Sequence, residues 1–216
     1  ALEEMKKQKV RRLLVFPLYP QYCASTTAST FDKITNILQK WRWIPEIRFI
    51  NNYFEEDLYI KAVSDSIKDK WNELGKPQKT VFSYHGIPLS YLMKGDPYHC
   101  YCLKTTRLVK EELGLNDEDV MTTFQSRFGS QEWLQPYTDE TLKKLPDQGI
   151  KDIHILSPGF SVDCLETIEE IGEENRDYFM KAGGNSYHYI NCLNDSKNHI
   201  NMISAIIKKH SQGWKV

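Results

Sequence analysis

The chain has 216 residues, of which 40% are hydrophobic and 26% charged, so it can form one substantial core or two small ones and is neither disordered nor fibrous in composition. Its formal net charge of -1 gives no large positive field, and no basic stripe interleaved with aromatic residues is present, so nucleic acid is not expected as a partner. No run of about eighteen apolar residues and no secretory signal are visible, so we expect a soluble, cytoplasmic protein.

The first part of the chain predicts two strand–helix units. A buried-strand pattern at residues 13–16 follows a charged lead that we do not assign to a helix, and a Ser/Thr cluster at residues 25–30 offers N-caps for a helix that continues to residue 41. A strand at residues 47–50 and a helix at residues 59–74 repeat the unit, and Gly75 and Pro77 end it. A domain boundary is expected there.

The remaining chain continues this alternation. Strands are predicted at residues 81–85, 120–125, 153–156 and 187–190. Helices are predicted at residues 103–113, 139–145, 163–180 and 199–210. Because strands that alternate with helices form parallel sheets, the sequence predicts an α/β fold.

The first candidate functional residue is His85. Gly86 frees the backbone and Pro88 cannot continue a ladder, so His85 is expected at the carboxyl end of a strand, the edge of an open parallel sheet where ligands bind. A histidine that merely completes a core or a loop remains an alternative. A second Ser-Tyr-His at residues 186–188 shows that three letters alone are weak evidence.

The second candidate is an acidic helix that follows the turn at Pro158 and Gly159. At helical spacing, one stripe comprises Asp163, Glu166, Glu170, Glu173 and Glu174, and the opposite stripe comprises Leu165, Ile168 and Ile171. A solvated acidic face over a buried apolar back explains this pattern. Alternatively, the first acids lie at a strand's carboxyl end, as His85 does, where imidazole and carboxylate together suit Fe²⁺ or accept protons.

Other common sites are absent from the sequence. There is no phosphate-binding loop, no dinucleotide fingerprint and no nucleophile elbow. The cysteines, at positions 23, 100, 102, 164 and 192, are odd in number and too sparse for a disulfide framework, so reduced thiols are expected. Cys100 and Cys102 lie beside His99 but lack the usual zinc spacing.

Long motifs in a fixed order give the chain a family resemblance. They comprise residues 17–21 with 25–27, residues 83–88, residues 124–129 with Trp133 and residues 136–140, and residues 157–170. In register over nearly the whole chain, they resemble the ferrochelatase family, particularly its gammaproteobacterial members. The resemblance implies a chelatase-like α/β fold of two Rossmann-like lobes, with parallel sheets flanked by helices and the first lobe incomplete. Residues 1–78 would be the second half of the N-terminal lobe, residues 79–198 the C-terminal lobe, and residues 199–216 a C-terminal helix and tail.

The resemblance also implies an activity and a set of site residues. The activity is that of a lyase, insertion of Fe²⁺ into protoporphyrin IX to form protoheme, the last step of haem biosynthesis. His85 and Glu166 would be catalytic, on opposite sides of the porphyrin, with a π-helical distortion at Glu170. The metal would meet His85, Glu166 and Glu170, and the porphyrin would contact Trp133, Pro88 and Phe128. Without the flanking motif, Trp133 would be interpreted as a core aromatic.

Three departures from the family pattern shape these expectations. Residues 13–20 match the middle of the family's first lobe, so the first third is missing and we expect this fragment to be inactive or impaired. Ala24 occupies the place of an iron–sulfur ligand, with Cys23 displaced by one position, and no cysteine-rich tail follows, so no iron–sulfur cluster is expected. No cofactor is required, since Fe²⁺ is a substrate. Cys164 stands where other members have histidine, which leaves metal preference open.

Two alternatives remain beside iron insertion. One is a chelatase for another metal or tetrapyrrole. The other is a non-catalytic carrier of tetrapyrrole or metal, which the missing first third would favour. Protoporphyrin IX and Fe²⁺ are the expected partners, and a peripheral membrane contact and the oligomeric state are left open.

Overall fold

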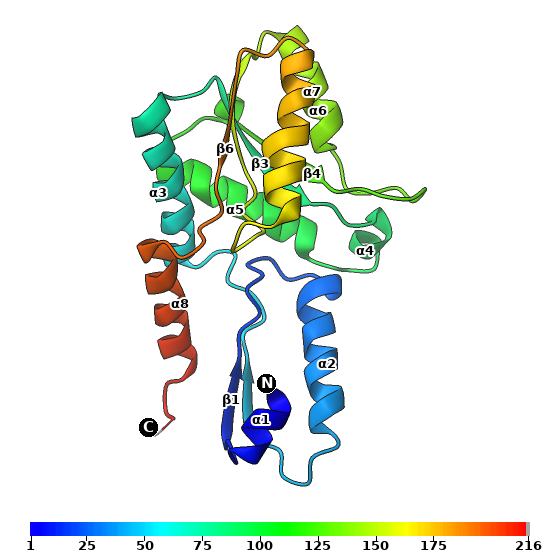
Figure 1. Cartoon of the computed structure of the whole chain (residues 1–216), viewed down its shortest axis with the longest axis vertical. Helices are drawn as coiled ribbons and strands as arrows, with labels where there is room; N and C mark the ends of the chain where they lie inside the picture. The colour runs from blue at the N-terminus through cyan, green and yellow to red at the C-terminus, as the bar shows by residue number, and fades with distance from the viewer. Residues whose placement is uncertain (215–216) are drawn as a thin grey trace.

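The computed structural model describes residues 1–214 and contains two parallel sheets (Figure 1). The smaller sheet pairs β1 (Arg12–Val15) with β2 (Glu46–Phe49). The larger sheet has the order β4-β3-β5-β6, formed by β4 (Val120–Gln125), β3 (Lys79–His85), β5 (Asp152–Leu156) and β6 (Ser186–Ile190). Every neighbouring pair runs parallel, so the predicted α/β class is confirmed.

Helices connect and flank these strands (Figure 1). The smaller sheet is accompanied by α1 (Leu2–Lys7), the π-helical turn η1 (Ala24–Ala28) and α2 (Ser29–Leu38). The larger sheet is accompanied by α3 (Asp57–Leu74), α4 (Leu89–Met93), α5 (Tyr98–Leu113), α6 (Thr138–Lys144), the π-helix η4 (Glu166–Glu174), α7 (Asn175–Lys181) and α8 (Lys197–His210). Two short 3₁₀ turns, η2 (Asp117–Asp119) and η3 (Pro146–Gln148), precede β4 and β5.

The side chains of β3 alternate between two cores, as the period of a strand requires. Phe82 and Tyr84 lie in the core that includes residues of α3 and α5. Val81 lies in the core that includes residues of α6, η4 and α7. With both faces covered, the strand is buried, and its carboxyl end is the part left for a ligand.

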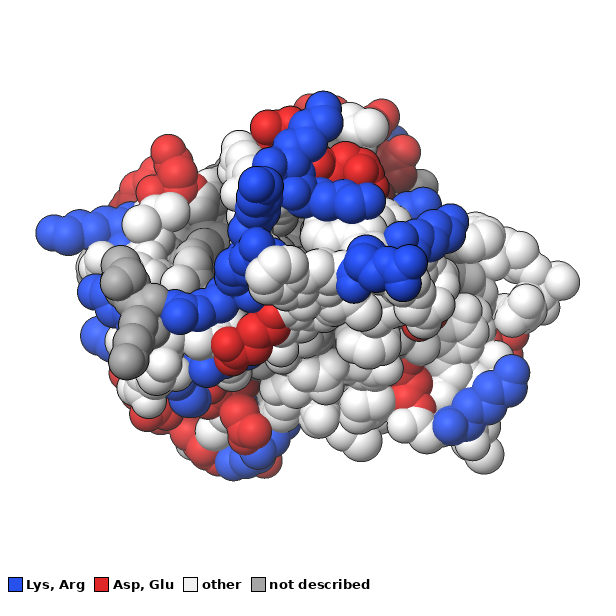
Figure 2. Space-filling model, turned by 90° about the horizontal axis from the view of Figure 1, so that it is seen from below, with Lys and Arg blue, Asp and Glu red and all other residues white. Residues whose placement is uncertain are grey.

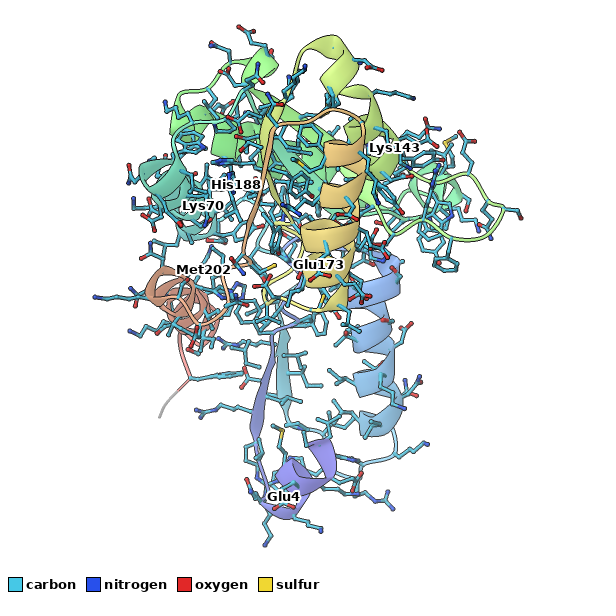
Figure 3. All side chains as sticks on the ribbon, turned by 45° about the horizontal axis from the view of Figure 1, so that its top comes forward. Glu4, Lys70, Lys143, Glu173, His188 and Met202 are labelled. Atoms are coloured by element: carbon cyan, nitrogen blue, oxygen red, sulfur yellow. The ribbon has the colours of Figure 1, made fainter. Side chains whose placement is uncertain are left out.

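One core is shared between the two sheets. Cys23, Ile50 and Tyr53, which follow the strands of the smaller sheet, belong to one core with residues of the larger sheet and with Met202. Figure 3 shows Met202 on α8. Helix α3 packs against α5 and α8. The larger sheet and the segment after β1 are therefore held together by packing, while the domain bounds at residues 78 and 198 stay predictions.

Residues 2–7 form a helix, α1, that the sequence analysis did not predict. Leu2, Glu3, Glu4 and the lysines of α1 are good helix formers, with acids in the first turn and bases in the last. Leu2 and Met5 pack against the small core of the N-terminal sheet. A six-residue helix is too short for its periodicity to be recognised, and tertiary packing stabilises it.

Viewed from below, the end of the molecule that carries α1 bears Lys and Arg together with Asp and Glu side chains, beside a broad area without charge (Figure 2). Trp43 is 65% exposed, and the Arg11 guanidinium lies over its ring.

Within residues 1–214, no helix combines the length and apolar composition needed to cross a bilayer.

Candidate active site

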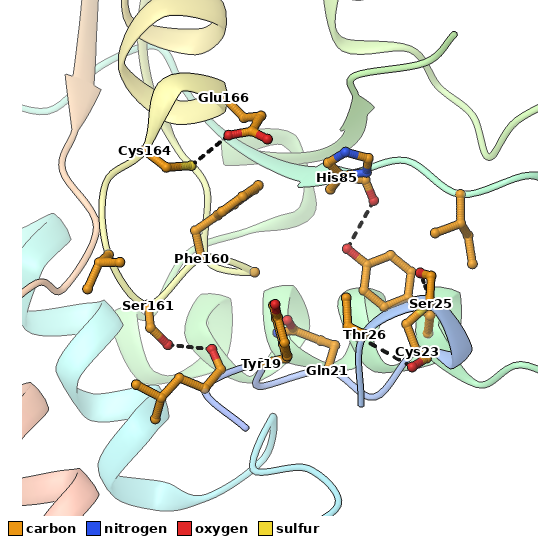
Figure 4. Close-up of a pocket in the computed structure, with 15 residues that line it drawn as sticks. Tyr19, Gln21, Cys23, Ser25, Thr26, His85, Phe160, Ser161, Cys164 and Glu166 are labelled. Carbon is orange, nitrogen blue, oxygen red and sulfur yellow. Dashed lines mark hydrogen bonds between the residues drawn. The ribbon is translucent and has the colours of Figure 1, made fainter. Parts of the chain in front are cut away.

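A cavity of about 450 Å³ opens at the carboxyl edge of the larger sheet (Figure 4). Its walls come from residues between 18 and 26, from His85 and Ile87 after β3, and from the segment between Gly159 and Glu166 after β5. A second cavity of about 550 Å³ shares Ser25, His85 and Ile87 with the first. His85 therefore lies where the two cavities meet.

His85 is the last residue of β3 and is held on two sides. Its ring Nδ1 lies 2.7 Å from the Gly86 carbonyl oxygen, and its own carbonyl accepts a hydrogen bond of 2.9 Å from the buried Tyr98 hydroxyl. A carbonyl oxygen only accepts, so Nδ1 carries a proton, and the neutral form of the ring would have its lone pair on Nε2. That nitrogen can accept a proton or bind a metal.

Gly86 lets the strand end approach its neighbours closely. Its N–H donates to the Gln125 carbonyl at 2.8 Å. A Cβ atom at this position would lie 2.9 Å from that oxygen and 3.2 Å from Cε3 of Trp133. The glycine is thus required by close backbone approach.

Glu166 begins η4 and lies on the wall of the first cavity (Figure 4). The Cys164 thiol donates to Glu166 Oε2 at 3.0 Å. The hydrogen bond from that thiol, with one from the backbone N–H of Glu166, lowers the pKa of the Glu166 carboxyl below its ordinary value. Burial acts in the opposite direction, and the nearby His85 ring adds a smaller lowering effect. The structure thus brings an ionised carboxylate and an imidazole to one cavity, and their catalytic roles stay predictions.

Glu170 lies outside both cavities. Its Oε1 accepts the Ser126 backbone N–H at 2.7 Å, and its Oε2 accepts the Ser126 hydroxyl at 2.5 Å. Ser126 has a φ of 63°, a conformation that costs energy for a residue other than glycine, and this pair of bonds helps to hold it. A metal role for Glu170 stays a prediction and requires these bonds to open.

The predicted apolar stripe is wrong at two of its three positions, whereas Glu166, Glu173 and Glu174 of the acidic stripe are exposed as predicted. Leu165 and Ile168 are 74% and 52% exposed, whereas Ile171 is buried as expected. The buried positions of η4 and α7 are instead Thr167, Ile171, Asn175 and Phe179, four residues apart. A π-helix bonds residue i to i+5 and so shifts the buried face away from the α-helical pattern. The π-helical distortion expected at Glu170 is confirmed.

Asp163 precedes the helix and does not belong to the acidic face. Its carboxylate accepts hydrogen bonds from Thr167, Tyr189, Asn191, the Cys192 N–H and Asn194. Burial would raise its pKa, but the bonds from Asn194, Tyr189 and Asn191 bring the pKa of Asp163 well below its usual range. This carboxylate fixes the start of η4 to the end of β6.

The three predicted porphyrin contacts line the second cavity. Trp133 is buried and pairs with Pro88 through an isolated β-bridge. Phe128 is 74% exposed, with its ring centroid 4.9 Å from that of Trp133. Nε1 of Trp133 has no acceptor among residues 1–214. Their contact with substrate stays a prediction.

Gln125 is a site residue to which the sequence analysis gave no role. It is buried at the end of β4, beside His85 in the sheet register. Its Oε1 accepts from Ser83 at 2.8 Å and Ser157 at 3.3 Å, and its Nε2 donates to the Glu166 carbonyl at 3.1 Å. Its position at a strand's carboxyl end was the available signal.

Within residues 1–214, no three His, Cys, Asp or Glu side chains converge closely enough to hold a metal ion. His85 and Glu166 alone would leave most coordination positions of an ion open. The expectation that no iron–sulfur cluster is present stays a prediction.

Solved structures with similar folds include SirB from Bacillus subtilis with Fe³⁺, with a TM-score of 0.70 and 17% identity over 98% of this chain and 76% of that one. Another is CbiX, described as the terminal enzyme of sirohaem biosynthesis in denitrifying bacteria, with a TM-score of 0.61 and 11% identity over 93% of this chain and 76% of that one. At such identities these likenesses establish the chelatase-like fold alone.

Sequence comparisons give closer relatives. A ferrochelatase of Marinobacter nauticus is 57% identical over 215 residues, covering 100% of this chain and 58% of that protein. A ferrochelatase of Idiomarina loihiensis is 55% identical over 215 residues, covering 100% of this chain and 59% of that protein. The chain therefore spans somewhat less than two thirds of the curated relatives it matches. Because the Ferrochelatase family model also matches residues 1–211, this chain belongs to the ferrochelatase family.

Proposed function

We propose that this chain acts in the insertion of Fe²⁺ into protoporphyrin IX to form protoheme, the last step of haem biosynthesis. The observation that carries the proposal is the junction of two cavities at His85, with Glu166 on one wall and Trp133 on the other. Together the cavities offer apolar and aromatic surface to a large flat ring. Family membership and the 57% identity to a curated ferrochelatase support the same reaction.

The reaction requires two pyrrole protons to leave as one Fe²⁺ enters, so the charge of the macrocycle with its metal is unchanged. In our proposal His85 accepts the two pyrrole protons one after the other at Nε2 and releases each to water, because Nδ1 already donates to the Gly86 carbonyl. Glu166 escorts the metal, since carboxylate oxygens bind divalent cations and release them readily. Glu170 joins this path only after its bonds to Ser126 open.

Binding energy must favour a bent ring over a flat one, because a metal reaches the central nitrogens only when the macrocycle is distorted. A cleft complementary to the bent form raises turnover, whereas equal binding of both forms does not. Trp133, which is buried and whose backbone pairs with that of Pro88, is the most rigid candidate surface for this task. Phe128 lies exposed beside it and can adjust to the substrate.

The test measures loss of porphyrin fluorescence as the metal enters. It uses this chain and an extended protein, in which this chain is joined to the part of the Marinobacter relative outside the matched residues. We expect insertion by the extended protein and impaired or no insertion by the chain alone. His85→Ala should lower turnover at saturating metal and porphyrin about 100-fold or more.

A matched control is His210→Ala, at the end of α8 and outside both cavities. It should leave turnover unchanged. Wild-type turnover in His85→Ala would contradict the assignment of the proton acceptor. Tight haem binding without insertion, even in the extended protein, would favour a carrier. Faster insertion of Co²⁺ or Ni²⁺ than of Fe²⁺ would favour a chelatase for another metal.

We also propose that this protein is cytoplasmic and makes a peripheral contact with a membrane surface. Leu18 and Val162 on the cavity wall are 41% and 54% exposed, and nearby Leu165 is 74% exposed. Such apolar side chains at a cavity mouth suit contact with lipid that delivers an apolar ring. Sedimentation with phospholipid vesicles should retain the wild type and release a Leu165→Ser variant, and equal retention of both would contradict this contact.

A further inference from the structure

The two candidate catalytic residues belong to different elements, and one buried residue contacts both. His85 ends β3, whereas Glu166 begins η4. Between them lies Gln125, at the end of β4 and 2% exposed. Its backbone carbonyl accepts the N–H of Gly86, the residue after His85, at 2.8 Å. Its side-chain amide donates to the Glu166 carbonyl at 3.1 Å.

The orientation of the Gln125 amide is fixed by its partners. Oε1 accepts from the Ser83 hydroxyl on β3 and from the Ser157 hydroxyl after β5. The Glu166 carbonyl only accepts, so the opposite end of the amide must be the NH₂ group. Ser83 is itself hydrogen-bonded to Thr138, at the start of α6. The amide thus joins the ends of β3, β4 and β5 to the first residue of η4.

The side chain of Glu166 needs a second restraint. The residue is exposed, and a free glutamate side chain samples several rotamers, whose restriction costs up to about 2 kcal/mol. Cys164 Sγ, 3.0 Å from Oε2, is the one side-chain donor to this carboxylate in the described part of the chain. Both atoms face the cavity wall on which His85 also lies (Figure 4).

We infer that Gln125 and Cys164 are positioning residues for iron insertion: Gln125 sets the separation of His85 and Glu166, and Cys164 aims the Glu166 carboxylate into the cavity. The inference rests on the proposed function. Neither residue has to touch the metal or the porphyrin in this role. A misplacement of about 1 Å in a reacting group can cost about 100-fold in rate, which is the scale that such restraints protect.

The variants follow from the two contacts. Gln125→Glu keeps the size and the Oε1 acceptor but replaces the donor to the Glu166 carbonyl by an oxygen. Cys164→Ala removes the thiol donor, and Cys164→Ser restores a donor of similar shape. Cys100→Ala is the matched control, because Cys100 is exposed and lies outside both cavities.

In the extended protein, Cys164→Ala should raise KM for Fe²⁺ about tenfold and leave KM for porphyrin unchanged. Cys164→Ser should return KM for Fe²⁺ most of the way to the wild-type value. Gln125→Glu should lower kcat between about 10-fold and 100-fold. A purely structural role of Cys164 predicts equal changes in KM for Fe²⁺ and for porphyrin, and no return of KM toward the wild-type value in Cys164→Ser. Kinetic constants of Cys164→Ala and Gln125→Glu within twofold of wild type would overturn the inference.

Amide hydrogen exchange in this chain separates the inference from the proposed function. Gln125→Glu should speed exchange in residues 166–171 about tenfold or more relative to α8, because η4 loses its tie to β4. If the extended wild type inserts no metal, the proposed function fails. Faster exchange confined to η4 in Gln125→Glu would still support the hydrogen bond between Gln125 and the Glu166 carbonyl as a restraint on η4. Unchanged exchange in η4 would overturn the positioning role of Gln125 whatever the activity.

Discussion

Replacement of Gly86 by alanine tests whether close packing at the end of β3 positions the site. The new Cβ atom would lie 2.9 Å from the Gln125 carbonyl oxygen and 3.2 Å from Cε3 of Trp133. That oxygen accepts the Gly86 N–H at 2.8 Å, so it cannot withdraw without weakening the bond. The Trp133 ring is 6% exposed and has little room to move. Overpacking costs about 1–3 kcal/mol, and a weakened hydrogen bond adds about 0.5–1.5 kcal/mol.

Urea unfolding should therefore show Gly86→Ala less stable than wild type by about 1.5–4.5 kcal/mol. The matched control is Gly172→Ala in η4, where the added Cβ would come no closer than 3.5 Å to the Thr167 carbonyl. Because alanine restricts the unfolded chain, Gly172→Ala should be neutral or stabilising by up to about 1 kcal/mol. If Gly86→Ala unfolds within about 0.5 kcal/mol of wild type, the strand end tolerates an added methyl group and this account of His85 placement is wrong.

Three further predictions concern stability. The buried Tyr187 hydroxyl donates to the Ile171 carbonyl at 2.5 Å, so Tyr187→Phe should cost about 1–2 kcal/mol in urea unfolding, and no loss would contradict a restraint on η4. Burial and the neighbouring His188 lower the pKa of His154 to about 4 in the folded protein. As the pH drops, His154 is therefore protonated in the unfolded chain before it is protonated in the folded protein. The free energy of unfolding should fall between about pH 6.5 and about pH 4. His154→Leu should flatten melting temperature over that range, and an unchanged slope would refute the assignment. Burial would raise the pKa of Asp163, but hydrogen bonding lowers it in the folded protein. The ionised carboxylate therefore stabilises the folded state at pH values above the unfolded pKa of about 3.9. Melting temperature should therefore fall as the pH drops below about 4, and Asp163→Asn should lessen that fall; an equal fall would count against it.

The placement of His85 could be predicted because several local signals agree. The apolar and aromatic run before it predicts a strand, and Gly86 and Pro88 predict its end. Strand β3 indeed ends at His85. Since parallel strands bring their carboxyl ends to one edge, the acids after β5 were expected near it, and Glu166 lines the same cavity.

The winding of η4 could not be derived from periodicity. An α-helical period places Leu165 and Ile168 inside, whereas both are exposed. Side chains from outside the helix satisfy its carbonyl groups: Gln125 binds that of Glu166, and Tyr187 binds that of Ile171. These partners come from distant strands, so no local pattern contains them; the family resemblance, not the spacing, indicated the distortion.

The role of Gln125 escaped prediction for a related reason. A single buried amide has no periodic signature, and its importance depends on which strand ends surround it. Only the register of β4 beside β3 brings it between Ser83 and Glu166. Buried polar groups need partners, so an amide at a strand end with such neighbours is constrained by all of them at once.

Three acids that share one sequence pattern end in three different environments, and this difference decides which can serve a metal. Asp163 is saturated by donors from its own helix turn and from the end of β6. Glu170 has both oxygens on Ser126. Glu166 faces the cavity with His85, and within residues 1–214 the Cys164 thiol is its one side-chain donor. Of the three acids, it therefore keeps the most oxygen lone pairs for an incoming ion without breaking strong hydrogen bonds. Under the proposed function, the order in which these carboxylates would engage iron follows from what their neighbours leave open: Glu166 first, Glu170 after Ser126 has moved, and Asp163 not at all.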